Sequence, residues 1–316
     1  MEQFMCESDL VKNTGKEPEM EHNCMQCPRL CGVDRAAGEL GFCGVPWEFL
    51  VARAALHKWE EPSISGKNGS GTIFFSGCNL RCVFCQNYEV SHEALGEKVD
   101  EDRLLALMLR LQDEGAHNIN LVTPTPYAHR LVEVLQRAKP QLQIPVVYNC
   151  GGYERVETLR ELDGLVDVYL PDFKYCDPTL AQEFSGAGNY FEVALAALSE
   201  MLRQVGKPRL DGEGMLLGGV IVRHLVLPGH RLDSVAVLQA LAERFGSDAF
   251  LLSLMSQYTP AFAARAPYKE LHRRVTSFEY EAVLAEVERL GFDGYFQSRT
   301  SASEAFTPDF HDALPL

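Results

Sequence analysis

The chain has 316 residues with 29 basic and 44 acidic side chains, which gives a formal net charge of −15. This acidic balance argues against a large nucleic-acid footprint, which needs a basic face. No stretch approaches the roughly 20 apolar residues of a membrane span, and the first residues lack the layout of a secretion signal. Ten cysteines in such a chain favour metal or redox chemistry in the cytoplasm over disulfides.

The N-terminal part is predicted to contain a flexible tail and then a Cys-rich extension. Residues 1–22 are polar and without periodicity, which is typical of a tail. Residues 23–71 hold a C-x2-C-x3-C-x11-C pattern, whose thiols are Cys24, Cys27, Cys31 and Cys43. Glycine and proline between them leave no apolar core, so we expect a metal to cross-link them, either zinc or a second iron–sulfur cluster. Reduced thiols without a metal are the alternative.

Three further cysteines follow a short apolar run. The segment 47–59 alternates apolar and polar residues, as a strand or a short helix would, and 60–71 is a predicted loop. A strand over 72–75 then leads into Cys78, Cys82 and Cys85, in C-x3-C-x2-C spacing. Three thiolates can hold three irons of a [4Fe–4S] cluster and leave the fourth open. Three buried free thiols are the alternative interpretation.

The rest of the chain alternates between strand and helix patterns. Strands are predicted over 118–123, 145–150, 165–170, 220–227 and 249–254, and helices over 100–114, 127–139, 154–162, 190–205 and 234–245. The segment 207–219 is predicted to be a loop or hairpin. Six strands with intervening helices indicate a parallel sheet in one α/β core over 72–258. An irregular basic segment, a helix over 279–290 and a tail complete residues 259–316.

The motifs resemble one family over most of the chain. Cys-rich residues from 24 onward, Gly-Cys-Asn-Leu-Arg-Cys-Val-Phe-Cys-Gln-Asn, Asn-Ile-Asn-Leu-Val-Thr-Pro-Thr, Asp-Phe-Lys and Arg-His-Leu-Val-Leu-Pro-Gly are similar to the radical S-adenosylmethionine (radical SAM) superfamily. They resemble in particular the branch related to pyruvate formate-lyase activating enzyme, called PflX-like. The resemblance implies a radical SAM core that is a partial (β/α)6 TIM-type barrel, here with a Cys-rich N-terminal extension. Ligands are expected at the carboxyl ends of its strands.

This resemblance assigns roles to individual residues. It implies that Cys78, Cys82 and Cys85 hold the [4Fe–4S] cluster. Phe84, just before the third cysteine, would lie against the adenine of S-adenosylmethionine, although an aromatic anchor for the loop is an equal interpretation.

The strand ends carry the other cofactor candidates. Asp172 and Lys174 match a pair expected near the methionine or ribose end of S-adenosylmethionine, and a lysine suits a carboxylate there. Activating enzymes place Gly-Gly-Glu after their second strand to receive the amino group of S-adenosylmethionine, where this chain has Thr123-Pro124-Thr125, so Thr123 and Thr125 are candidates for that role. Arg223 and His224 are further candidates.

The resemblance also implies an activity. The reduced cluster would cleave S-adenosylmethionine to methionine and a 5′-deoxyadenosyl radical that abstracts hydrogen from a partner protein, as in the activation of glycyl-radical enzymes. A reductant such as flavodoxin or ferredoxin is expected. The alternatives are radical modification of another peptide or a small metabolite, and a non-catalytic iron–sulfur or metal-binding module. The sequence assigns no catalytic side chain.

Overall fold

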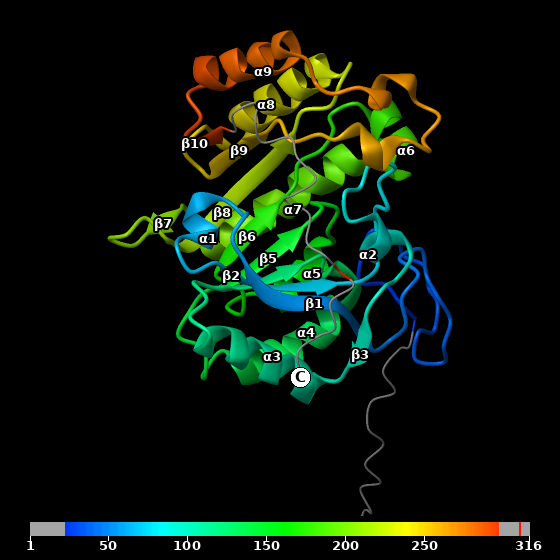
Figure 1. Cartoon of the computed structure of the whole chain (residues 1–316), viewed down its shortest axis with the longest axis vertical. Helices are drawn as coiled ribbons and strands as arrows, with labels where there is room; N and C mark the ends of the chain where they lie inside the picture. The colour runs from blue at the N-terminus through cyan, green and yellow to red at the C-terminus, as the bar shows by residue number, and fades with distance from the viewer. Residues whose placement is uncertain (1–22, 297–309, 311–316) are drawn as a thin grey trace, which may run out of the picture.

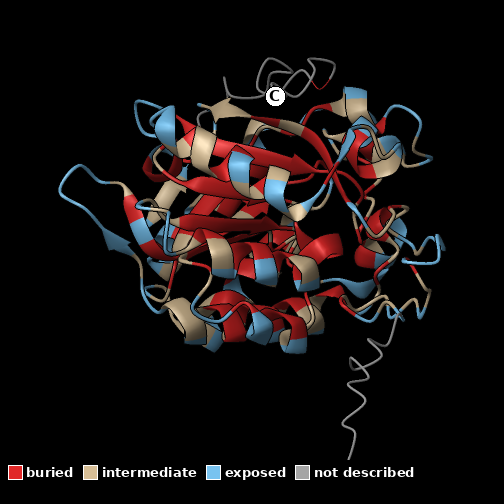
Figure 2. Cartoon of the chain, turned by 90° about the horizontal axis from the view of Figure 1, so that it is seen from below, coloured by how far each residue is buried: buried red, intermediate tan, exposed pale blue. Residues whose placement is uncertain are grey.

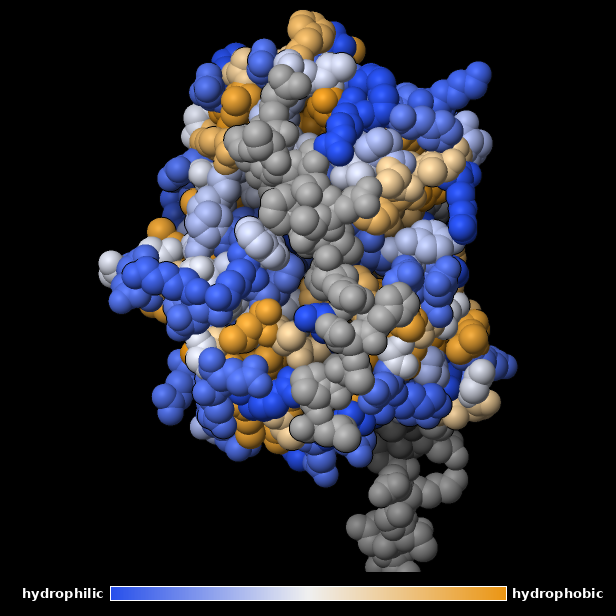
Figure 3. All heavy atoms as spheres, in the orientation of Figure 1, coloured by the Kyte–Doolittle hydropathy of each residue, from blue (hydrophilic) through white to orange (hydrophobic). Residues whose placement is uncertain are grey.

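A mostly parallel sheet forms the centre of the molecule (Figure 1). The computed structural model describes residues 23–296 and Phe310. The tail predicted over 1–22 lies outside the described residues, as does the C-terminal tail apart from Phe310. Within the described part no helix has the length and apolarity that a membrane crossing requires. Hydrophilic side chains predominate on the face shown in Figure 3, and apolar ones form small separate groups.

Seven parallel strands lie side by side in the order β10-β9-β8-β6-β5-β4-β2. They are β2 (Ser70–Phe75), β4 (Ile119–Val122), β5 (Val146–Cys150), β6 (Val168–Pro171), β8 (Leu216–Leu225), β9 (Leu251–Met255) and β10 (Gly294–Phe296). The first six are the predicted strands, and β10 was not predicted. The predicted α/β fold is therefore confirmed, with one more parallel strand at its far edge.

The predicted helices follow their strands and cover the sheet. They are α3 (Glu101–Asp113), α4 (Ala128–Ala138), α5 (Val156–Glu161), α7 (Tyr190–Val205), α8 (Arg231–Phe245) and α9 (Ser277–Leu290). Asp100 caps α3 by accepting a hydrogen bond from the Arg103 backbone N–H. Thr276 and Glu279 form a capping box on α9. Figure 2 shows buried strands between helices whose outer faces are exposed.

Two ambiguous segments both form strands. The segment 47–59 contains β1 (Phe49–His57), which pairs antiparallel with β2 on one side and with β3 (Glu97–Val99) on the other. The segment 207–219 is a hairpin, because β7 (Arg209–Leu210) pairs antiparallel with the start of β8. The Cys-rich extension thus contributes β1, which lies between β2 and the edge strand β3.

Several short elements were not predicted. They are the helices α1 (Pro62–Ser65), α2 (Tyr88–His92) and α6 (Pro178–Ser185), and the 3-10 turns η1 (Thr125–Tyr127), η2 (Pro260–Ala263) and η3 (Lys269–His272). The local signals for α6 are clear in retrospect. Asp177 caps its first turn, Pro178 occupies the first helical position, and Gly186 ends it in the left-handed conformation.

One face of the sheet carries a small apolar cluster, to which helix α1 also contributes, that we call the inner cluster. Its members are Ile64, Val147, Val168, Leu170, Leu216 and Ile221. Tyr169 lies between two of these residues in β6 but belongs to the main core, since side chains alternate along a strand. The inner cluster therefore marks the strand positions that face the barrel interior.

Candidate active site at the carboxyl ends of the parallel strands

The loop between β2 and α2, which we call the cluster loop, brings three thiols to one cavity. Cys78, Cys82 and Cys85 all line a cavity of about 220 Å³ at the carboxyl ends of the parallel strands. The Leu80 backbone N–H donates to Cys78 Sγ over 3.4 Å. The Ser185 hydroxyl donates to Cys82 Sγ over 3.0 Å. Polar hydrogens thus point at sulfur, as they do around iron–sulfur clusters.

The cluster loop begins at a glycine that no other residue can replace without movement. Gly77 has φ +80°, and a Cβ built on it would lie 2.4 Å from Val45 Cγ1 and 2.8 Å from the Cys43 carbonyl oxygen. Arg81 also has a positive φ, of 50°. Its guanidinium donates to the Phe42 carbonyl over 3.2 Å, which helps to hold the loop in this strained form.

Burial raises the pKa of two thiols of the cluster loop. It raises the pKa of Cys78 to about 12, with the neighbouring Cys82 as the next cause. Burial also raises the pKa of Cys85, against which the Ser91 hydroxyl and the Asn87 backbone N–H act. Metal coordination stabilises thiolates that burial disfavours. Three buried or half-buried thiols on one cavity, with N–H and O–H donors at Cys78 and Cys82, fit a [4Fe–4S] cluster with one open iron.

Polar side chains replace apolar ones where the strands reach the cavity. Asn149, Asp172 and Arg223 each lie two positions after a member of the inner cluster, so they face the same side of the sheet. Arg223 is the centre of this group. Its Nε donates to Asp172 Oδ1 over 2.9 Å, and its terminal nitrogens reach Asn149 Oδ1 at 2.6 Å and Glu60 Oε2 at 3.4 Å.

The predicted pair Asp172 and Lys174 lies in this cavity as an ion pair. Lys174 Nζ donates to Asp172 Oδ2 over 2.6 Å, and both side chains line the cavity with the three thiols. Burial works against the charge on Asp172, but Arg223 and Lys174 outweigh it and hold its pKa below its usual range. Lys174 therefore stays charged beside the thiols, where a cation can bind a carboxylate.

Glu60 is a cavity residue that the sequence did not reveal. It follows β1, and its Oε1 accepts from Asn120 over 3.1 Å and from Asn149 over 3.4 Å. His57 and Trp59 line the same cavity. The segment 60–71 has the composition of a solvent-exposed loop, which hides a buried acid. The available signal was the polar Asn120 and Arg223 within otherwise apolar strands, which predicts a polar partner facing them.

The two threonines after β4 have different surroundings. Thr123 lines the cavity and has φ 57°, which is a rare conformation for a β-branched residue. Thr125 is not among the residues that line this cavity, and its hydroxyl donates to Glu154 Oε1 over 2.7 Å. Of the two candidates that replace Gly-Gly-Glu, Thr123 is the one that faces the cavity.

Phe84 and His224 differ in their relation to the cavity. Phe84 lines the cavity and also packs edge-on against Phe184 and Tyr258, with ring centroids 6.2 Å apart in each pair. Both of its predicted roles, adenine contact and loop anchor, therefore fit its position. His224 does not line the cavity, and its Nδ1 donates to the Phe173 carbonyl over 2.7 Å. Burial lowers the pKa of His224 to about 4, so it is a neutral core histidine.

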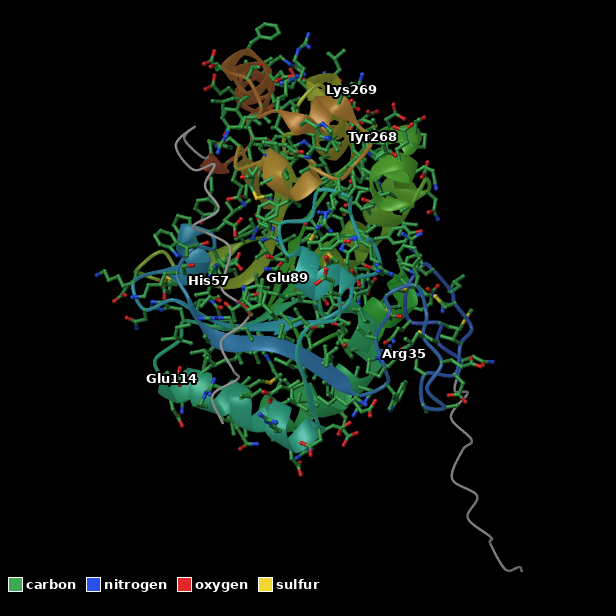
Figure 4. All side chains as sticks on the ribbon, turned by 45° about the vertical axis from the view of Figure 1, so that its right-hand side comes forward. Arg35, His57, Glu89, Glu114, Tyr268 and Lys269 are labelled. Carbon is green, nitrogen blue, oxygen red and sulfur yellow. The ribbon has the colours of Figure 1, made fainter. Side chains whose placement is uncertain are left out.

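The other four predicted metal ligands lie in the N-terminal segment 23–44, which contacts the cluster loop. In Figure 1 this segment is the dark blue trace beside α2. Figure 4 labels Arg35 in this segment and Glu89 on α2. Among the described residues no three His, Cys, Asp or Glu side chains are arranged to hold a single metal ion. This result applies to both sets of thiols: those of the cluster loop, and Cys24, Cys27, Cys31 and Cys43.

Comparison with known proteins places this site in a family. The profile of the Radical SAM superfamily matches residues 72–242, which include the cluster loop and the strand ends described above. The chain belongs to the radical SAM superfamily. Membership implies a [4Fe–4S] cluster and S-adenosylmethionine as cofactors and supports an enzyme that cleaves S-adenosylmethionine to a radical.

The sequence is also 31% identical to an uncharacterized protein of Methanocaldococcus jannaschii over 279 residues, which are 86% of this chain and 76% of that protein. Among solved structures, spore photoproduct lyase gives a TM-score of 0.49 at 14% identity, covering 74% of this chain and 78% of that one. SuiB of Streptococcus suis, solved with its precursor peptide SuiA, gives 0.46 at 13% identity, with coverages of 70% and 46%. Methylornithine synthase gives 0.45 at 16% identity, with coverages of 67% and 59%. The chain spans less than two thirds of the last two proteins.

Proposed function

We propose that this chain is a radical SAM enzyme whose 5′-deoxyadenosyl radical abstracts hydrogen from a partner protein or peptide, as in the activating enzymes that its motifs resemble. The observation that carries the proposal is the meeting of Cys78, Cys82 and Cys85 with Asp172 and Lys174 around one cavity. When bound, the reduced cluster supplies the electron that splits S-adenosylmethionine into methionine and the radical.

Each cavity residue has a role that follows from its surroundings. The three thiols of the cluster loop would hold the irons. Lys174, kept charged by Asp172, would bind the carboxylate of S-adenosylmethionine. Thr123 would accept a hydrogen bond from the amino group, because its strained backbone turns it toward the cavity. Phe84 would support the adenine.

A protein or peptide substrate is supported by what lies at the cavity. Trp59 lines it and is 63% exposed, so this aromatic side chain is accessible to a partner at the cavity. Exposed aromatic residues are frequent anchors for partner proteins. A flavodoxin or ferredoxin of the cytoplasm is the proposed reductant. A glycyl-radical enzyme is the proposed partner, and another peptide is the second candidate.

Anaerobic turnover tests the first half of the proposal. The protein is reconstituted with iron and sulfide, reduced with dithionite and given S-adenosylmethionine, and 5′-deoxyadenosine is measured by chromatography. We expect product from the wild type, none from Cys82→Ala, and wild-type amounts from Cys176→Ala, which alters a half-buried thiol that does not line the cavity. A wild type that forms a cluster but releases no more product than Cys82→Ala would contradict the proposal.

Deuterium labelling tests the second half. With a glycyl-radical enzyme or peptide whose glycine Cα carries deuterium, transfer of deuterium into 5′-deoxyadenosine is the expected result, read by mass spectrometry. Trp59→Ala should lower this transfer while leaving the unproductive cleavage of S-adenosylmethionine at the wild-type rate. Equal loss of both would show that Trp59 supports the cavity and does not contact the partner.

A further inference from the structure

The N-terminal segment 23–44 folds with half-buried thiols and with its large apolar side chains exposed. Met25, Leu30, Leu40 and Phe42 are all exposed. Apart from an isolated bridge between Asn23 and Asp34, the segment contains no regular secondary structure. A stretch of 22 residues without helix, strand or apolar core needs another cross-link to hold one conformation, and a metal centre is the usual one for cysteine-rich segments.

Two thiols of this segment accept hydrogen bonds from nitrogen, as Cys78 of the cluster loop does. Cys31 Sγ accepts from the Phe42 N–H over 3.4 Å, and Cys24 Sγ accepts from Gln26 Nε2 over 3.6 Å. In the cluster loop, Cys78 Sγ accepts from the Leu80 N–H over 3.4 Å. Such hydrogen bonds stabilise thiolate ligands of iron–sulfur clusters.

Backbone hydrogen bonds bring the cysteines of this segment together. The Cys24 N–H donates to the Val33 carbonyl over 2.9 Å, and the Gly32 N–H donates to the Cys24 carbonyl over 3.1 Å, so Cys24 lies beside the chain that follows Cys31. The Leu30 N–H donates to the Cys27 carbonyl over 3.1 Å, which closes a turn between Cys27 and Cys31. Gly41, two positions before Cys43, packs against the thiol of Cys31, since a Cβ there would lie 3.1 Å from its Sγ. Both ends of the segment therefore fold back toward Cys31.

The segment is fixed to the cluster loop by direct contacts. Arg29 Nε donates to the Asn79 carbonyl over 2.7 Å, and another of its nitrogens donates to the Ser185 carbonyl over 2.8 Å. The Arg29 guanidinium also lies 3.9 Å from the centroid of the Phe42 ring. From the other side, Gly77 lies directly against the Cys43 carbonyl. The two sets of thiols are thus held on adjoining stretches of backbone.

The spacing of the cysteines along the chain favours one of the two metals predicted from the sequence. A zinc ribbon pairs two C-x2-C knuckles. Cys24 and Cys27 form one such knuckle, but eleven residues separate Cys31 from Cys43. In a [4Fe–4S] cluster each thiolate binds a different iron, so four cysteines at uneven spacing can serve.

We propose that Cys24, Cys27, Cys31 and Cys43 bind a second [4Fe–4S] cluster, held against the loop that carries the first. All four of its irons have a protein ligand, so it offers no open iron to S-adenosylmethionine. This second cluster goes beyond the proposed function, because it would form whether or not the cavity cleaves S-adenosylmethionine.

Metal analysis of two complementary variants tests the proposal. One variant replaces Cys24, Cys27, Cys31 and Cys43 by serine, and the other replaces Cys78, Cys82 and Cys85 by serine. After anaerobic reconstitution we expect about eight irons in the wild type and about four in each variant, with matching sulfide. Cys176→Ser is the control and should keep the full iron content.

Spectroscopy separates this proposal from the proposed function. The variant without cluster-loop thiols should keep iron–sulfur absorption and, when reduced, an EPR signal that S-adenosylmethionine does not change. The wild type should show an additional signal that does change. This variant leaves residues 23–44 intact, so it decides the question even if the fourfold variant does not fold. One zinc per wild-type chain, or no iron in the variant without cluster-loop thiols, would overturn the proposal.

Discussion

The cluster loop and the N-terminal segment carry similar thiols on very different supports. The cluster loop is suspended between β2 and α2, and the strand ends around it supply buried charges such as Asp172 and Lys174. The segment 23–44 has no regular element and is held by arginine side chains that reach backbone carbonyls. A frame of strands can position a reaction to a fraction of an ångström, whereas a segment of this kind depends on its cross-link. We therefore expect damage to the barrel to affect catalysis, and damage to the segment to affect metal retention.

The strongest test of this contrast is Asp172→Asn. The substitution leaves Lys174 and Arg223 without their shared carboxylate in a buried site, which should cost about 3–5 kcal/mol of unfolding free energy. Binding of S-adenosylmethionine should weaken as well, while iron in the N-terminal segment is retained. Asp163→Asn is the control, because its ion pair with Arg203 is exposed and worth at most about 1 kcal/mol. Equal destabilisation by the two variants would contradict the buried network.

Gly77→Ala should damage both regions at once. Its new methyl group would meet Val45 and the Cys43 carbonyl, so overpacking and a strained φ together should cost about 2–4 kcal/mol. Iron should fall at both thiol sets. Gly38→Ala is a matched control, since Gly38 has φ +91° but nothing within 4 Å of the added Cβ, and it should cost only about 1 kcal/mol. Thermal unfolding and iron analysis make the comparison, and similar losses in both variants would mean that the contact at Gly77 is unimportant.

His224 predicts a pH dependence that belongs to the barrel alone. Its pKa is lowered to about 4 by burial, with a smaller effect of Lys174 opposed by Asp172. The unfolded chain takes up a proton below about pH 6.5, and the folded chain resists it. Stability is therefore full above pH 6.5 and falls by about 2 kcal/mol by pH 5. His224→Asn keeps a donor for the Phe173 carbonyl. The variant should lose this pH dependence when unfolding midpoints are measured from pH 7 to pH 5. An unchanged dependence would mean that another group causes it.

Arg29→Lys should give the smallest effect and the most local one. A lysine keeps the charge but cannot reach several carbonyls or stack on Phe42, so about 1–2 kcal/mol should be lost. The segment 23–44 should become more sensitive to limited proteolysis, while cleavage of S-adenosylmethionine persists. Arg155→Lys is the control, because Arg155 makes one hydrogen bond to this segment, at the Met25 carbonyl. If the two variants are cleaved equally fast, Arg29 is not the main attachment of the segment.

The sequence was most informative where chemistry and periodicity act over a short range. The shared location of the cluster-loop thiols and the helix over 190–205 could both be predicted, because each depends on residues that are close in sequence. The short helix α6 also has local signals, in Asp177, Pro178 and Gly186. The strand β10 had none, since three residues after a helix become a strand only when a sheet edge is available to pair with them.

The cavity residues also show that prediction from local sequence misses long-range contacts. Asp172 and Lys174 could be predicted from a motif that lies within three residues of sequence. Glu60 could not, because its partners Asn149 and Arg223 lie 89 and 163 residues away. A buried acid is recognisable only once the groups that compensate it are known. Long-range compensation is a property of the folded chain and leaves no local pattern.

The attachment of Arg29 has a consequence for how the protein is made. Its acceptor at Ser185 is synthesised 156 residues after it. At translation rates of about 5–20 residues per second, the N-terminal thiols leave the ribosome roughly 8–30 seconds before their docking surface exists. During that interval Cys24, Cys27, Cys31 and Cys43 are open to oxidation. Early delivery of iron or protection from oxygen would therefore matter more for this segment than for the cluster loop, whose preceding strand is made immediately before it.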